Sequence, residues 1–416
     1  MPESRKLVVE RSGGKLAWIP SAWRVSLDWK ILVARRYHRP STPLESHVTA
    51  RFQPPLLGLI LIGGGAFAFL ALKVGNRGIF SDSELDSPLE LIRVDQASGT
   101  RMLLQAVSPV NDRIVWVSGH GGTYARTLDG GQSWSANVIS GAEDLQFRDI
   151  DAFDERTAYL MSSGSGPLSR IYRTNDGGLT WDLQFVNDHP SGFLDCMAFW
   201  NPSRGLAYGD AIEGRLFILK TEDGGTSWTR VQDEAIPPAQ EGEGGFAASG
   251  SCVETGPQGR AWIATGNAEM PRLLWTENEG RTWSFATVPT VGGEAAGLTT
   301  VDFLDNERGI TLGGIIGQDT VFVDNVAVTS DGGRHWILGG RPSMRGPVYG
   351  SSWVPGSPSA TVFAVGPGGA NYSTDGGLTW ETAAHVTYWA VSFVSPGAGW
   401  AVGPEGRITR FGFEGE

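Results

Sequence analysis

Paired carboxylates come nearest to catalytic chemistry in this sequence. Asp149 and Asp151 alternate on one expected strand, and Asp210 and Glu213 flank an expected turn. Two carboxyl groups around a scissile bond are what glycoside hydrolysis requires, one as the proton donor and the other as nucleophile or base. Acidic residues are abundant in this chain, with 45 Asp and Glu against 33 Lys and Arg. We therefore expect solvated turns to account for both pairs, and we assign no catalytic residue.

Metal and cofactor chemistry has little support. The 416 residues contain 2 cysteines, without a C-x-x-C motif, and 6 scattered histidines, a composition that disfavours a structural zinc site. No glycine-rich phosphate loop follows an expected strand, and the net charge of -12 opposes nucleic-acid binding. We predict no metal, no cofactor, no nucleic acid and no small-molecule substrate.

Six near-identical octapeptides carry the strongest signal. They follow the pattern Ser/Thr-x-Asp-x-Gly-x-Thr-Trp, the Asp-box or BNR repeat, and span residues 127–134, 174–181, 221–228, 276–283, 329–336 and 373–380. The Asp can accept N–H bonds from the turn that follows it, the glycines tolerate positive φ, and the Trp folds back over the hairpin. In the fourth copy Asn278 and Glu279 replace Asp and Gly, so we expect that turn to be the loosest. The predicted turn-forming residues are Asp129, Trp134, Asp176, Trp181, Asp223, Trp228, Trp283, Asp331, Trp336, Asp375 and Trp380.

Each Asp-box lies within a longer sequence repeat. Their tryptophans are 44 to 55 residues apart, which suits one four-stranded propeller blade. Alternating strands open the units, for example at residues 147–153, 193–199, 298–304 and 388–394. The seventh unit, residues 388–413, stops before any box, and residues 89–94 supply the strand that it lacks. A ring closed in this way has no open sheet edge, so we predict an all-β, seven-bladed β-propeller.

Two features lie near the expected central channel. Cys196 and Cys252 fall on the opening strands of consecutive units. We expect two separate buried thiols, because the sequence does not supply the Cα separation that a bridge requires; a disulfide is the alternative, which export would permit. The longest irregular insertion, residues 233–250, is either a cover for one mouth of the channel or a flexible spacer. Its Glu241 and Glu243 are candidate partner contacts.

Propellers with Asp-boxes resemble two groups, the sialidases with related glycoside hydrolases, and the photosystem II stability and assembly factor family. Over residues 88–413 the chain is similar to the second group and its bacterial relatives, which share seven blades and the G-W-A-V-G-x-x-G-x-I form found at residues 399–408. This resemblance implies a non-enzymatic protein that docks on photosynthetic reaction-centre polypeptides. A sialidase would have an Arg-Ile-Pro near the first blade, and the strings at residues 113–115, 170–172 and 407–409 lack the Pro.

The charge distribution changes before the propeller. Residues 1–53 carry 10 Lys and Arg and 4 Asp and Glu, whereas residues 54–416 carry 23 and 41. Between them the uncharged residues 56–72 would reach about 25 Å as a helix, near the lower limit for crossing a bilayer. Because basic flanks stay inside, we predict a cytoplasmic extension (1–53), a transmembrane helix (54–74), a linker (75–87) and a periplasmic propeller (88–416). A cleaved signal peptide and a buried core helix are the alternatives.

The basic extension has patterns of its own. Alternating apolar residues indicate a β-hairpin and a strand, and an interfacial helix over residues 21–37 is the alternative. Candidate contacts with a larger complex lie in this extension and in the glycine run of the apolar segment. They are Trp18, Trp23, Trp29, Arg35, Arg36, Gly63, Gly64 and Gly65.

These features lead to three hypotheses. The first is a single-pass protein of the inner, photosynthetic membrane whose periplasmic propeller assembles or stabilises a reaction-centre complex, with reaction-centre or light-harvesting polypeptides as its partners. The second is a scaffold of the same architecture for a non-photosynthetic envelope complex. The third is a sialidase-like glycoside hydrolase.

Overall fold

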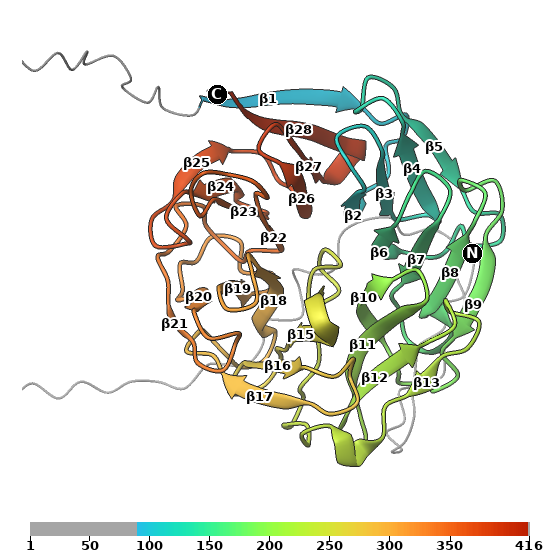
Figure 1. Cartoon of the computed structure of the whole chain (residues 1–416), viewed down its shortest axis with the longest axis vertical. Helices are drawn as coiled ribbons and strands as arrows, with labels where there is room; N and C mark the ends of the chain where they lie inside the picture. Colours follow the sequence, from blue (N-terminus) through green and yellow to red (C-terminus); the bar gives the residue numbers. More distant parts are fainter. Residues whose placement is uncertain (1–89, 415–416) are drawn as a thin grey trace, which may run out of the picture. The chain divides into compact units, whose positions relative to one another are not determined.

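The computed structural model describes residues 90–414, which form 28 β-strands and four short 3-10 helices. The strands make seven four-stranded antiparallel sheets around a common centre (Figure 1). The predicted all-β, seven-bladed propeller is therefore confirmed. Six blades follow the sequence order from the innermost strand outwards, and the seventh combines the two ends of the described chain.

The strand bounds of the first four blades are as follows. Blade 1 comprises β2 (Leu104–Pro109), β3 (Val115–Gly119), β4 (Thr123–Thr127) and β5 (Ser135–Val138). Blade 2 comprises β6 (Phe147–Ala152), β7 (Ala158–Ser162), β8 (Arg170–Thr174) and β9 (Asp182–Val186). Blade 3 comprises β10 (Leu194–Asn201), β11 (Arg204–Ile212), β12 (Arg215–Thr221) and β13 (Thr229–Arg230). Blade 4 comprises β14 (Val253–Gly256), β15 (Arg260–Ala264), β16 (Arg272–Thr276) and β17 (Ser284–Thr287).

The remaining blades complete the ring. Blade 5 comprises β18 (Ala296–Phe303), β19 (Gly309–Ile315), β20 (Val326–Thr329) and β21 (Ile337–Leu338). Blade 6 comprises β22 (Gly350–Trp353), β23 (Val362–Gly366), β24 (Gly369–Ser373) and β25 (Glu381–Ala384). Blade 7 comprises β26 (Ala390–Ser395), β27 (Ala398–Val402), β28 (Arg407–Glu414) and β1 (Glu90–Ala97). The 3-10 helices are η1 (Gly166–Leu168), η2 (Asp233–Ala235), η3 (Pro257–Gly259) and η4 (Pro404–Gly406).

The second strand of a blade is covered on both faces, because the neighbouring blades pack against it from either side. β3 has the sequence Val-Trp-Val-Ser-Gly and β7 has Ala-Tyr-Leu-Met-Ser, and every residue of both is buried. Near-continuous apolar runs are typical of strands that are buried on both faces. The outer strands β5 and β13 are mostly exposed and polar. The core therefore lies between blades as much as within them.

Aromatic rings fill these contacts between blades. Tyr159 of β7 stacks on Phe199 of β10 with 4.1 Å between ring centroids, and Trp262 of β15 stacks on Phe303 of β18 at 3.8 Å. Tyr159 Oη and Trp262 Nε1 each donate a hydrogen bond to a glycine carbonyl in the Asp-box of the next blade, at 2.8 and 3.0 Å. Each ring thus joins the core of one blade to the Asp-box turn of its neighbour.

The ring closes where the first and last strands pair. β1 runs antiparallel to β28, with Leu91 opposite Phe413 and Asp95 opposite Thr409, and Figure 1 shows the light-blue β1 beside the red β28. Thr409 Oγ1 donates a hydrogen bond to Asp95 Oδ1 at 2.7 Å between residues 314 positions apart. The prediction that residues 89–94 supply the missing strand of the seventh blade is confirmed for residues 90–94.

The predicted cytoplasmic extension, transmembrane helix and linker lie outside the described residues, together with the candidate contacts Trp18, Trp23, Trp29, Arg35, Arg36, Gly63, Gly64 and Gly65. Within residues 90–414, no helix combines the length and the apolar character needed to cross a membrane. The anchor and its orientation stay predictions.

Candidate functional site

The Asp-box side chains are bonded within their own turns. In the first box, Thr127 Oγ1 donates a hydrogen bond to Asp129 Oδ1 at 2.7 Å, and the Ser133 N–H donates to the same oxygen at 2.9 Å. Gly130 and Gly131 adopt φ of 76° and 86°, which glycine tolerates without strain. The hydrogen bonds from Ser133 lower the pKa of the Asp129 carboxyl to about 2. These are the contacts expected of a turn-forming carboxylate.

The fourth Asp-box keeps this geometry despite its substitutions. Thr276 Oγ1 donates to Asn278 Oδ1 at 2.9 Å, and the Thr282 N–H donates to the same oxygen at 3.0 Å. Glu279 adopts a φ of 58° where the other copies have glycine, a conformation uncommon for such a residue. The turn expected to be the loosest therefore retains its hydrogen bonds and differs in backbone strain at Glu279.

The tryptophans of the boxes cover the blade edges. Trp283 and Trp336 are buried, and Trp134, Trp181, Trp228 and Trp380 are half-buried. Trp134 Nε1 donates to Gln96 Oε1 at 3.1 Å, which ties the first blade to the closing strand β1. Trp380 Nε1 donates to the Gly340 carbonyl at 2.9 Å, which ties blade 6 to the end of blade 5.

A second set of polar contacts links the innermost strands to one another. In several blades a side-chain oxygen near the end of the inner strand accepts a hydrogen bond from a backbone N–H of another blade's inner strand. The acceptor and donor residues are Ser108 with Ala152 (3.0 Å), Asp149 with Met197 (2.6 Å), Asp151 with Phe199 (3.0 Å), Asp302 with Trp353 (2.6 Å) and Ser352 with Phe393 (3.0 Å). These residues hold adjacent blades in register.

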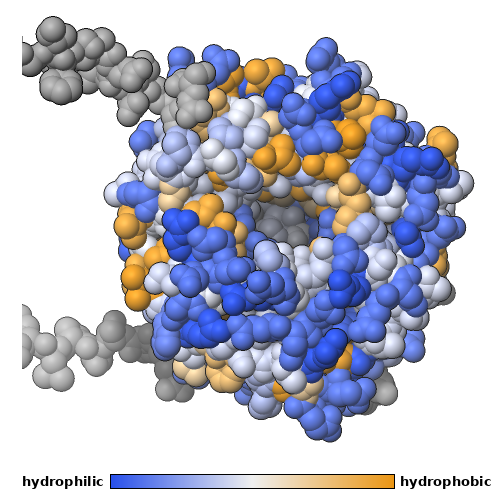
Figure 2. All heavy atoms as spheres, viewed as in Figure 1, coloured by the Kyte–Doolittle hydropathy of each residue, from blue (hydrophilic) through white to orange (hydrophobic). Residues whose placement is uncertain are grey.

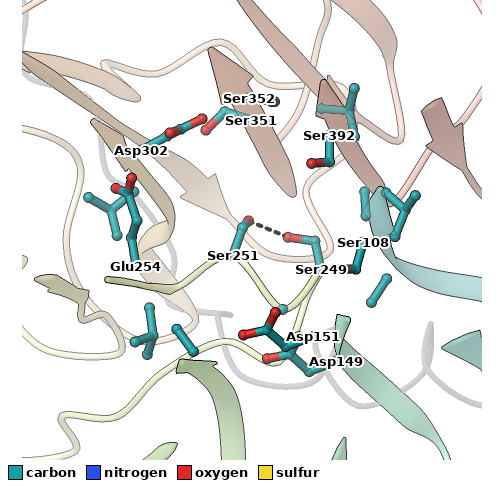
Figure 3. A pocket seen from close by; sticks show the side chains of 18 of the residues that line it. Ser108, Asp149, Asp151, Ser249, Ser251, Glu254, Asp302, Ser351, Ser352 and Ser392 are labelled. Carbon is teal, nitrogen blue, oxygen red and sulfur yellow. Dashed lines mark hydrogen bonds between the residues drawn. The ribbon is translucent and has the colours of Figure 1, made fainter. Parts of the chain in front are cut away.

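The same ends of the inner strands enclose a cavity of about 430 Å³ at the centre of the ring. Figure 2 shows this centre as a hollow in the surface. Acidic and hydroxyl side chains reach into the cavity from several blades (Figure 3). They are Asp149, Asp151, Glu254, Asp302, Ser108, Ser249, Ser251, Ser351, Ser352 and Ser392.

The cavity carries acidic groups without basic ones. None of the described residues that line it is Lys, Arg or His. Three converging arginines, which a sialidase-like site would need, are therefore not supplied by these lining residues. The expectation that solvated turns account for Asp149 and Asp151 is wrong, because both face the cavity and bond to β10. Glu213 does lie in an exposed turn, whereas Asp210 lies within β11 and is partly buried, so the expectation holds for Glu213 alone.

Burial raises the pKa of each carboxyl in the cavity, since it disfavours the charged form. The pKa of Asp151 and that of Asp302 rise to about 7. The pKa of Asp149 rises well above its ordinary value through burial, with a further contribution from the Asp151 carboxyl. Burial and then the nearby Asp302 carboxyl raise the pKa of Glu254 well above its ordinary value. Near neutral pH these carboxyls therefore retain protons that solvent-exposed carboxyls would release.

The insertion at residues 233–250 reaches the channel beside this cavity, where its last residues bond to several blades. The Ala247 carbonyl accepts a hydrogen bond from Arg148 Nη1 of blade 2 at 3.2 Å. The Ala248 carbonyl accepts one from Gln105 Nε2 of blade 1 at 3.4 Å, and Ser249 Oγ donates to the carbonyl that precedes β22 at 2.6 Å. Because this short stretch contacts three blades, the segment is a fixed plug and not a flexible spacer.

Glu243 belongs to the interior of this plug, which corrects its prediction as a partner contact. Its side chain has an exposed fraction of 0% and pairs with Arg272, whose side chain is 5% exposed. Arg272 Nε donates to Glu243 Oε1 at 2.8 Å, and Thr265 Oγ1 donates to the same oxygen at 2.8 Å. Glu241, two residues earlier, is exposed and stays a candidate contact.

Cys196 of β10 and Cys252, directly before β14, form a disulfide with a Cα separation of 5.8 Å. Both cysteines are fully buried. The expectation of two separate thiols is wrong, because the packing of blades 3 and 4 brings residues 56 positions apart within bridging distance. The bridge joins the inner edges of two neighbouring blades.

The closed ring and its Asp-box turns define a seven-bladed Asp-box β-propeller that resembles the photosystem II assembly factors. The BNR/Asp-box repeat family matches at residues 372–382. The photosystem II assembly lipoprotein Ycf48 of Synechococcus sp. (strain CC9902) is 25% identical over 221 residues, which is 53% of this chain and 57% of that relative. The photosystem II assembly protein Ycf48 of Synechococcus sp. (strain JA-2-3B'a(2-13)) is 22% identical over 368 residues, 86% of this chain and 97% of the relative.

Solved structures agree on the fold. A structure of Ycf48 bound to D1 peptide superposes with a TM-score of 0.55 at 18% identity, and covers 79% of this chain and 98% of that one. Ycf48 from Cyanidioschyzon merolae superposes with a TM-score of 0.54 at 14% identity, and covers 77% of this chain and 98% of that one. The likeness extends over almost the whole of both neighbours.

Proposed function

We propose that this protein is a non-enzymatic propeller subunit that assembles or stabilises a photosynthetic reaction-centre complex. Residues 54–74 anchor it in the inner membrane, and the propeller lies on the periplasmic side. The observation that carries the proposal is the match to a photosystem II assembly protein over 97% of that relative's length, together with seven blades in this chain. A solved Ycf48 is bound to D1 peptide, which supports a polypeptide as the partner here as well.

The disulfide supports the periplasmic side of the proposal. Cys196 and Cys252 are bridged between blades 3 and 4, and stable disulfides belong to oxidising compartments such as the bacterial periplasm. The bridge is buried in the ring, so its position is that of a structural cross-link. An exported propeller accounts for this pairing without a separate redox role.

Three attachments to one assembly would make weak contacts sufficient. The basic extension, the apolar segment and the propeller are joined in one chain, so the first contact raises the effective concentration of the other two. Removing residues 1–53 should loosen the complex while leaving the propeller folded. Melting of the truncated protein and its yield in the purified complex separate these two effects.

The direct test is to place an affinity tag at the C-terminus, solubilise native membranes in mild detergent, and record the absorption spectrum of the co-purified material. Chlorophyll or bacteriochlorophyll bands in stoichiometric amount identify a resident subunit. Faint bands, enriched in partly built complexes, identify a transient assembly factor. A colourless preparation refutes the photosynthetic partner and favours a scaffold of another envelope complex.

A further inference from the structure

Glu254 is the one cavity carboxyl with a buried oxygen that no described residue satisfies, although the Phe303 N–H of β18 interacts with its carboxyl. Asp149, Asp151 and Asp302 each accept a backbone hydrogen bond from another inner strand, so they hold blades together. Glu254 Oε2 is buried and has no hydrogen-bond partner among the described residues. An unsatisfied buried carboxyl oxygen is costly, and in a native protein it calls for a partner.

The surroundings of Glu254 indicate the charge of that partner. Figure 3 shows its carboxyl and that of Asp302 on one side of the cavity, with Asp149 and Asp151 on another. The residues lining the cavity include four acids and no basic side chain. A positive group with several N–H donors would satisfy the free oxygen and reduce the repulsion among the carboxyls, and such charge-assisted hydrogen bonds are among the strongest in proteins.

The shape of the site limits the size of the ligand. Ser249 of the plug and Ser251 directly after it line the cavity, so this segment occupies one side of the site. Pro109, Leu304 and Pro355, at or after the ends of inner strands, also line the cavity. A cavity of about 430 Å³ has room for one long side chain and not for a folded element.

We propose that this cavity binds the guanidinium or ammonium group of an arginine or lysine side chain presented by a partner polypeptide. The carboxyls of Glu254 and Asp302 receive the cation, and the hydroxyls of Ser251 and Ser351 line the same cavity. That the cation belongs to a polypeptide and not to a free small molecule rests on the proposed function; the charge of the ligand rests on the cavity alone.

Binding should be linked to proton release. The titratable groups that face the cavity are Asp149 and Asp151 from β6, Glu254 from β14 and Asp302 from β18. The pKa values of Asp151 and Asp302 are raised to about 7, so these groups are largely protonated at pH 6. A bound cation favours the carboxylate form. Affinity should therefore increase from pH 6 to pH 8.

The test uses the purified full-length protein in detergent and two blocked pentapeptides, Ac-Gly-Ser-Arg-Ser-Gly-NH2 and its citrulline counterpart. Citrulline has the shape of arginine without the charge. Isothermal titration calorimetry should show the arginine peptide binding at least about tenfold more tightly at pH 8, as charge-assisted hydrogen bonds imply. Glu254→Gln should abolish this preference, because it removes the charge and keeps a side-chain oxygen that can accept the Phe303 N–H. Glu294→Gln, at an exposed residue, should leave the preference unchanged.

The comparison of the two peptides on the unmodified protein remains decisive if Glu254→Gln fails to fold. Equal affinities for them at pH 8 would refute the cation site. Spermidine binding more tightly than the arginine peptide would refute the polypeptide source. A colourless complex whose propeller still prefers the arginine peptide would refute the proposed photosynthetic function alone, whereas a pigmented complex without the preference would refute this inference alone.

Discussion

Replacing both cysteines of the bridge between blades 3 and 4 by alanine should lower the free energy of unfolding by about 4 kcal/mol. The bridged cysteines are 56 residues apart in sequence. The loss of denatured-state entropy on cross-linking is worth about 3 kcal/mol for a loop of roughly 15 residues and about 4.7 kcal/mol for one of roughly 100. For a described body of about 325 residues, with an unfolding entropy of about 2.1 cal/mol/K per residue, this corresponds to a decrease in Tm of about 6 °C.

Differential scanning calorimetry of Cys196→Ala/Cys252→Ala beside the unmodified protein measures this decrease. The unmodified protein treated with a phosphine reductant should melt like the variant, and the reductant should not affect the variant. Peptide mapping without reduction establishes that the bridge is present in the starting material. If the mapped bridge is intact and the variant still melts at the same temperature as the unmodified protein, the entropic argument is refuted.

Three further predictions concern the plug, the Asp-boxes and the closing strand. Glu243→Gln should lower the free energy of unfolding in urea by about 3 kcal/mol, because it leaves the buried Arg272 without its charged partner. Glu241→Gln, at an exposed residue, should change the free energy of unfolding by less than about 0.5 kcal/mol. Equal effects of the two substitutions would contradict the burial of the Glu243–Arg272 pair. The pKa of Asp129 is lowered to about 2, so its contribution to stability is present above the ordinary value of 3.8 and is lost as the pH falls through about 2. Asp129→Asn should therefore remove the acid-induced loss of amide protection in that turn, measured relative to intrinsic exchange, and an unchanged dependence of protection on pH would count against the prediction. A chain beginning after β1 should elute as aggregates in size-exclusion chromatography, because β28 becomes an open sheet edge. A chain beginning at residue 88 should elute as the full propeller does. Identical elution of the two chains would show that β1 is dispensable.

Most of the fold follows from patterns that are local in the sequence. The Asp-box turn is specified within eight residues, and even the fourth copy keeps its hydrogen bonds because the Asn278 oxygen occupies the place of the Asp carboxylate. The seventh unit lacks a box and residues 89–94 lack a preceding box, so the pairing of β1 with β28 follows from counting strands. These features depend on the order of residues along the chain.

The cavity and the bridge depend instead on which residues of different blades meet. A signal for the bonds between inner strands is present in the sequence, since Asp302 and Ser352 each directly precede an aromatic residue near the end of an inner strand. Nothing in that pattern shows that Glu254 has a buried, unpaired oxygen, or that Cys196 and Cys252 lie within bridging distance. Such contacts are fixed by the rotation of one blade relative to the next, which sequence spacing does not determine.

Because β1 pairs with β28, the order in which the strands are synthesised determines when the ring can close. The ribosome delivers β1 first among the described strands and β28 last, so blade 7 cannot be completed until all the other described strands have been made. Contacts such as that between Asp95 and Thr409, 314 residues apart, form only after a large loop-closure entropy has been overcome, which places them late in folding. Every chain released too early therefore carries an unpaired strand and an open ring. A closed ring therefore distinguishes a complete propeller from an incomplete one.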